Sequence, residues 1–203
     1  MKRTRILLLV ILAVLLPGCG RLEKAESNTI EIGKDGSISE VSVETFKKGK
    51  LSESELEDFV NDSISGYNSQ AGKDAAELKK LKVKGETARV IMEYKSWEDY
   101  KDFHQVPLFI GSVAQAAASG YAFDGEFRDR KGQAAVSGMI SALGEEYQVA
   151  VISEAIAVIV PGEIQYVSDN VKVLEEDMVS IEKSDSANQA LVTLEHPAYI
   201  IYN

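Results

Sequence analysis

Few residues in this chain of 203 have the chemistry of a catalytic or metal-binding site. The chain contains one cysteine, Cys19, and two histidines, His104 and His196. Neither histidine belongs to an H-E-x-x-H motif or to a cysteine and histidine pair with the spacing of a zinc site. Both are therefore interpreted as partly exposed structural histidines, and we expect no metal or cofactor.

Two short serine motifs match motifs of penicillin-recognising enzymes. Ser180-Ile181-Glu182-Lys183 fits S-x-x-K, and Ser168-Asp169-Asn170 fits S-D-N. In those enzymes S-x-x-K comes first and opens a helix, so that the lysine lies one turn from the serine and can accept its proton. Here S-x-x-K comes second, in strand-like surroundings, and no K-T-G follows. The two motifs are therefore interpreted as a strand end and a turn.

Carboxylates and aromatic residues leave two further alternatives open. The chain has 32 acidic residues, and glycan hydrolysis needs only two of them, so a hydrolase with a carboxylate pair from distant segments is one alternative. Trp97, Tyr100 and Phe103 have the i, i+3, i+6 spacing of a helix that packs against a core. We favour the core for these three residues, with a ligand site as the alternative.

The first 19 residues have the three parts of a secretory signal. A basic region at residues 2–5 is followed by an apolar run at residues 6–16 and by Pro17-Gly18 before Cys19. An apolar run of this length is too short to span a membrane, which takes about 20 helical residues. The segment Leu16-Pro17-Gly18-Cys19 resembles the lipobox of bacterial lipoproteins.

The resemblance implies that a diacylglyceryl group, with fatty acids such as palmitate, is attached to the thiol of Cys19. The lipoprotein signal peptidase then removes residues 1–18, and the new amino terminus is open to acylation. The alternative is an ordinary secreted protein in which the cysteine stands here by chance. Lipidation of the only cysteine excludes a catalytic thiol and an internal disulfide. Two acyl chains give stable anchoring, so we expect the protein on the extracytoplasmic face of a bacterial cell membrane.

The charge of the chain limits its partners. The net charge is −10, and it is −13 without residues 1–18, which contain three of the 22 basic residues and no acid. A chain this acidic is not suited to bind nucleic acid. Two basic clusters stand out against this background, Lys47, Lys48 and Lys50 in the first and Lys79, Lys80, Lys82 and Lys84 in the second. They form either an ordinary solvated surface or, if they share a face, a surface toward anionic lipid or wall polymer.

Residues 29–203 are predicted to form a single α+β domain, with a subdivision near residue 105 as an alternative. Residues 19–28 are predicted to be the lipidated cysteine and a polar tether that spans at most about 30 Å. The pattern predicts antiparallel hairpins over residues 29–46 and 80–94 and a strand-rich second half.

Short helices and short strands are expected along the rest of the domain. Helices are predicted after the capping box Ser52-Glu53-Ser54-Glu55, after Ser96, over residues 112–119 and over residues 136–143. Strands are predicted over residues 147–153, 155–160, 164–167, 171–174, 178–182 and 190–202.

These features favour a membrane-anchored lipoprotein that is a binding or envelope-assembly module rather than an enzyme. Its expected partners are membrane lipid, through acylated Cys19, and an envelope protein or a glycan. The alternatives are the envelope hydrolase described above and an accessory subunit of a membrane complex, which would expose a large apolar patch. The sequence leaves the ligand, the oligomeric state and the type of bacterial envelope open.

Overall fold

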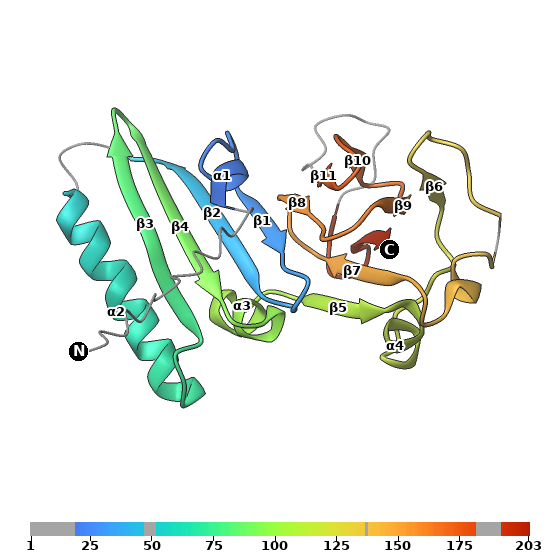
Figure 1. Cartoon of the computed structure of the whole chain (residues 1–203), viewed down its shortest axis with the longest axis horizontal. Helices are drawn as coiled ribbons and strands as arrows, with labels where there is room; N and C mark the ends of the chain where they lie inside the picture. The colour runs from blue at the N-terminus through green and yellow to red at the C-terminus, as the bar shows by residue number, and fades with distance from the viewer. Residues whose placement is uncertain (1–18, 47–51, 137, 182–191) are drawn as a thin grey trace, which may run out of the picture.

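The computed structural model describes residues 19–46, 52–136, 138–181 and 192–203, and its strands form two sheets (Figure 1). The strand-rich α+β fold predicted from the sequence is confirmed. The seven-stranded sheet has the order β10 (Lys172–Val173), β11 (Met178–Ser180), β8 (Ala157–Ile159), β1 (Thr29–Ile32), β2 (Ile38–Thr45), β4 (Thr87–Tyr94) and β3 (Ala76–Lys84). The five-stranded sheet has the order β5 (Leu108–Ser112), β7 (Gln148–Ile152), β12 (Ala198–Tyr202), β9 (Ile164–Ser168) and β6 (Phe127–Asp129).

Both predicted hairpins lie in the seven-stranded sheet. β1 pairs antiparallel with β2, and β3 pairs antiparallel with β4 across a turn in which Gly85 has a φ of 67°. Glycine adopts this left-handed conformation without the steric cost that a Cβ atom brings. β1 also pairs in parallel with β8, so elements from both sides of residue 105 share this sheet.

The described helical segments are α1 (Cys19–Leu22), α2 (Glu53–Ala71), α3 (Trp97–His104), α4 (Val113–Ala118) and the 3-10 turn η1 (Ser141–Leu143). α2 begins at the predicted capping box, in which the Ser52 hydroxyl accepts from the Glu55 amide and the Glu55 carboxylate accepts from the Ser52 amide. α3 follows its N-cap Ser96, as predicted, and α4 follows its N-cap Ser112. A side-chain oxygen at these positions satisfies an amide that has no partner inside the helix.

The predicted helix over residues 136–143 is wrong. Residue 137 lies outside the described residues, but residues 138–143 form turns and the short η1, and Gly138 has a φ of 76°. Of the four apolar residues that suggested the helix, only Ile140 is buried, while Val136 and Met139 are exposed. β5 and β6 are strands that the sequence analysis does not predict. Both are short, and β5 contains Gly111, which weakens the strand pattern.

Three apolar clusters divide the molecule into layers. The largest lies between the two sheets and includes Ile30 and Ile38 of the first sheet and Ile152 and Ile200 of the second. The second cluster covers the other face of the five-stranded sheet under α4 and η1. The third covers the other face of the seven-stranded sheet and contains Leu22 of α1.

α2 covers the edge of the seven-stranded sheet at β3, where backbone groups would otherwise lack partners (Figure 1). The Asn68 carboxamide accepts from the amides of Ala75 and Ala76 and donates to the carbonyl of Ala76. At the other end of the helix, the Glu53 carboxylate accepts from the Val83 amide. These contacts hold a helix whose only buried side chain is Ile64.

Candidate functional site

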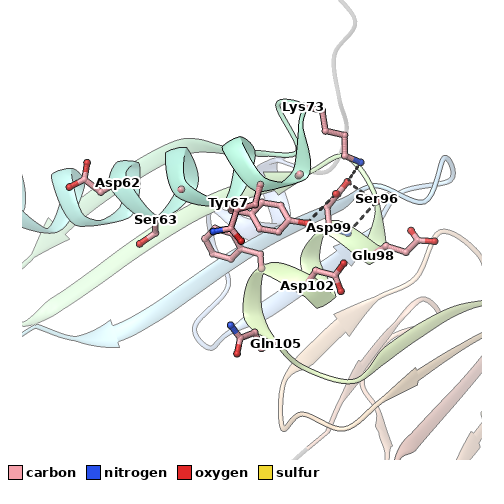
Figure 2. Close-up of a pocket in the computed structure, with 13 residues that line it drawn as sticks. Asp62, Ser63, Tyr67, Lys73, Ser96, Glu98, Asp99, Asp102 and Gln105 are labelled. Carbon is pink, nitrogen blue, oxygen red and sulfur yellow. Dashed lines mark hydrogen bonds and ion pairs between the residues drawn. The ribbon is translucent and has the colours of Figure 1, made fainter.

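A groove of about 910 Å³ lies between α2 and α3 (Figure 2). One wall is formed by the second half of α2, and the other by α3 with its cap Ser96. Its lining is mostly polar and includes four carboxylates, those of Asp62, Glu98, Asp99 and Asp102. The sequence does not predict this site, because its residues come from two helices and a loop that are far apart in the chain.

The Asp99 carboxylate lies at the inner end of the groove and binds three neighbouring side chains (Figure 2). Its side chain is 6% exposed and accepts hydrogen bonds from the hydroxyls of Ser96, at 2.7 Å, and Tyr67, at 3.2 Å. The Lys73 ammonium lies 3.0 Å from the same carboxylate. Burial raises the pKa of Asp99, but these hydrogen bonds and the Lys73 charge outweigh it and hold that pKa below its usual value. Burial and the neighbouring Asp99 raise the pKa of Tyr67 to about 12.

The remaining carboxylates of the groove are exposed and leave it acidic. Asp102 lies 3.6 Å from its neighbour Lys101. The side chains of Asp62 and Glu98 make no hydrogen bond or ion pair with other described residues. Since Lys73 is already paired with Asp99, the free charge in the groove is negative, which favours a ligand that carries a cation.

The three aromatic residues on α3 have different environments. Tyr100 is 1% exposed and packs in the central core, which agrees with the core interpretation. Trp97 and Phe103 are half-buried against the same core. Phe103 also lines the groove, with its ring 5.5 Å from that of Tyr67, so this residue serves both the core and the candidate site.

A buried polar cluster lies beneath α3, on the inner face of the seven-stranded sheet. The Glu40 carboxylate of β2 is 7% exposed. One of its oxygens accepts from the Tyr94 hydroxyl, at 2.9 Å, and from Nε2 of His104, at 2.9 Å. Its other oxygen accepts from the Ser42 hydroxyl at 2.8 Å. His104 is thus partly exposed, as expected, but it is also half of an ion pair that the sequence did not indicate.

Hydrogen bonding and burial shift the pKa values of this cluster. Burial opposes the charged forms of both partners, yet the hydrogen bond and opposite charge between them lower the pKa of Glu40 and raise that of His104. Glu154 accepts from the Tyr100 hydroxyl at 3.3 Å, and burial raises its pKa. Neither Glu40 nor Glu154 lines the groove between α2 and α3.

The S-D-N motif and the second histidine lie near the end of β9, whereas Ser180 of S-x-x-K is the last residue of β11. The Ser168 hydroxyl donates to the Asn170 side chain and accepts from the Tyr199 amide, so it ties a turn to β12. His196 is 48% exposed, with Nε2 3.4 Å from Asp169. These contacts fit the interpretation of S-D-N as a turn. Lys183 of the S-x-x-K motif lies outside the described residues.

The segment after Cys19 packs against the domain and is not the extended tether expected from the sequence. Leu22 is fully buried against the outer face of the seven-stranded sheet. The Arg21 guanidinium binds Asp177, with its shortest contact at 2.6 Å, and Glu175, at 2.8 Å. The composition of residues 20–28 suggested a tether, but one buried leucine and one arginine are enough to hold it in place.

The basic clusters are described only in part, since Lys47, Lys48 and Lys50 lie outside the described residues. Lys79 binds Glu93 at 3.1 Å and Lys80 binds Glu23 at 2.8 Å. In the described ranges no helix is long and apolar enough to cross a membrane. The same ranges contain no group of three or more His, Cys, Asp or Glu residues placed to hold a metal ion.

Comparison with known proteins gives no relative for this arrangement. No family model, no curated protein and no solved structure matches the chain.

Proposed function

We propose that this chain is a lipid-anchored binding module on the extracytoplasmic face of a bacterial membrane. The proposal rests on the position of α1, the segment that begins at the lipobox cysteine, relative to the groove. α1 packs against one face of the seven-stranded sheet through Leu22, whereas α3 packs against the opposite face around Tyr94. A domain anchored at Cys19 therefore leaves the groove open on the side away from the lipid.

The groove offers recognition chemistry for a ligand with cationic and hydroxyl groups. The exposed Asp62 and Glu98 can pair with ammonium groups, and the amides of Gln70 and Gln105 can bind hydroxyls. The partner in this proposal is an amine-bearing component of the envelope, whether a basic protein segment or a glycan. The half-buried ring of Phe103 adds an apolar surface of the kind that orients ligands in such sites.

Binding is better supported than hydrolysis in this groove. A general acid needs a carboxyl group with a raised pKa, as in glycoside hydrolases. The buried carboxylate of the groove, Asp99, has a lowered pKa and is fixed by three partners. Glu154 has a raised pKa, but it does not line the groove.

The anchor is tested by replacing Cys19 with alanine. The unchanged chain is expected in the membrane fraction and to incorporate a palmitate analogue, because the thiol carries the lipid in this proposal. Cys19→Ala is expected to lose the label and move to the soluble fraction. A wild-type chain that is unlabelled and soluble would overturn the proposal. A Ser27→Ala variant, which keeps the lipobox, is the matched control.

The groove is tested in cells with a photo-crosslinking amino acid at Gln70, which lines it, or at Ser69, which does not. We expect a discrete product at Gln70 that is absent at Ser69. Asp62→Lys with Glu98→Lys is expected to reduce this product at least about fivefold, because two attractive charges become repulsive.

The matched control reverses the same number of charges outside the groove, with Glu57→Lys and Glu126→Lys. Both residues are exposed, and neither lines the groove. The control is expected to keep the Gln70 product. Equal products from Gln70 and Ser69, or equal losses in the two double variants, would contradict a binding role for the groove.

A further inference from the structure

The docked segment after Cys19 leaves almost no slack between a lipid anchor and the domain. Arg21 is fixed by Asp177 and Glu175, and the buried Leu22 follows it directly. The Arg89 guanidinium, from β4, donates to the carbonyl oxygens of Leu22 and Ala25 and holds the same segment. Cys19 is two residues before Arg21, and two residues span at most about 7 Å even when extended, so an acyl group on Cys19 would lie close to this face of the sheet.

The register of β3 places a row of lysines on the same face. After a bulge between Leu78 and Lys80, Lys80 lies opposite Ile91, Lys82 opposite Arg89 and Lys84 opposite Thr87. Ile91 belongs to the apolar cluster that contains Leu22. Because side chains alternate along a strand, Lys80, Lys82 and Lys84 project from the face that α1 covers. Lys80 forms an ion pair with Glu23, the residue that directly follows α1.

The acidic residues of this face that lie beside β3 are paired with lysines. Glu23 is paired with Lys80 and Glu93 with Lys79, whereas Arg21 alone faces Glu175, Asp177 and the partly buried Glu31, so the acidic charge that remains lies beside α1 and not along β3. By contrast, the exposed Lys82 and Lys84 make no ion pair with other described residues. The charge left free along β3 is therefore positive, on a chain whose net charge is strongly negative.

We infer that the α1 face of the seven-stranded sheet is the surface on which the domain rests against the bilayer, with Lys80, Lys82 and Lys84 on anionic lipid headgroups. The inference depends on the proposed function, since the lipid on Cys19 brings the face to the membrane. The lysines then fix the orientation of the domain. The groove between α2 and α3, on the opposite face, is held away from the bilayer.

The test uses the purified lipidated protein in vesicles of phosphatidylglycerol or of phosphatidylcholine. Cys19 is the only cysteine and carries the lipid, so one introduced cysteine is the only free thiol. A fluorophore is attached at Thr87→Cys, on the α1 face, or at Ser65→Cys, on the exposed side of α2. Quenching by lipids with a headgroup quencher is then measured.

We expect strong quenching at position 87 and little at position 65 in phosphatidylglycerol vesicles, with a smaller difference in phosphatidylcholine. Lys82→Glu with Lys84→Glu is expected to lower the population in the quenched orientation at least about 25-fold, since each lysine near an anionic surface contributes about fivefold and each glutamate adds repulsion. The exposed pair Lys34→Glu and Lys131→Glu, which changes the net charge equally, is the matched control and is expected to keep the quenching.

The outcomes separate this inference from the proposed function. If the measured mass of the protein includes the lipid but quenching is equal at positions 65 and 87, the inference is overturned and the proposed anchor stands. Unchanged quenching in the Lys82 and Lys84 variant would overturn the role of the lysines. A measured mass that does not include the lipid would overturn both the proposed function and this inference.

Discussion

Replacing His104 with leucine is expected to lower the free energy of unfolding by about 2–3 kcal/mol, because it leaves the buried Glu40 carboxylate without its charged partner. Removal of one member of a fully buried pair costs about 3–5 kcal/mol, and the partial exposure of His104 reduces this value. The Tyr94 and Ser42 hydroxyls still donate to Glu40, which also limits the loss. Urea unfolding followed by circular dichroism measures the change.

The double variant Glu40→Leu with His104→Leu shows whether the pair is coupled. Two leucines of similar volume can pack against Tyr94 and Tyr100, so we expect the double variant to be more stable than the sum of the single losses predicts, by more than about 1 kcal/mol. Glu40→Gln, which keeps hydrogen-bonding groups but removes the charge, is the control. Additive losses in this cycle would show that Glu40 and His104 act independently.

The fold was largely predictable because its signals are local. Ser52 and Ser96 mark helix starts through the hydrogen bonds of their own hydroxyls, and the turn at Gly85 joins two strands that are adjacent in the chain. The failed helix over residues 136–143 had the apolar spacing of a helix. That spacing does not account for Gly138, whose positive φ is incompatible with a helix.

The candidate site was not predictable in the same way. Asp99 gains its role from Lys73 and Tyr67, which lie 26 and 32 residues away, and Glu40 lies 64 residues from His104. No spacing rule connects such positions. One signal was present in β2, where Ile38 and Val41 are both apolar although they point to opposite faces. This pattern indicates a strand buried on both sides, so that Glu40 between them must lie in a core and needs a partner.

The docked N-terminal segment shows the same limit. Residues 20–28 have the composition of a tether, and only Leu22 is a large apolar residue among them. Its burial depends on Val41, Ile91 and Ile159, which come from three strands. Composition predicts whether a segment can remain solvated, but it does not show whether the fold offers a place for a single leucine.

The stability of the protein is expected to be highest in mildly acidic solution, between about pH 4.5 and 6.5, because of the same buried pair. The pKa of His104 is raised in the fold, so its contribution is complete below the ordinary value of 6.5 and is lost as the pH rises through the folded value. The pKa of Glu40 is lowered, so its contribution is complete above 4.5 and is lost as the pH falls through the folded value. Urea unfolding from pH 3.5 to 9 measures both limbs.

Glu154 also affects how the free energy of unfolding depends on pH, but it does not reverse the loss of stability at alkaline pH. Burial raises its pKa, so its protonated form stabilises the fold, and this contribution declines as the pH rises above 4.5. His104→Leu is therefore expected to flatten the profile above pH 6.5, whereas Glu154→Gln removes the part of the decline that begins above pH 4.5. A His104→Leu variant that loses stability above pH 6.5 as steeply as the unchanged chain would assign the alkaline limb to other groups. The ion pair beneath α3 would then not govern how the fold responds to pH.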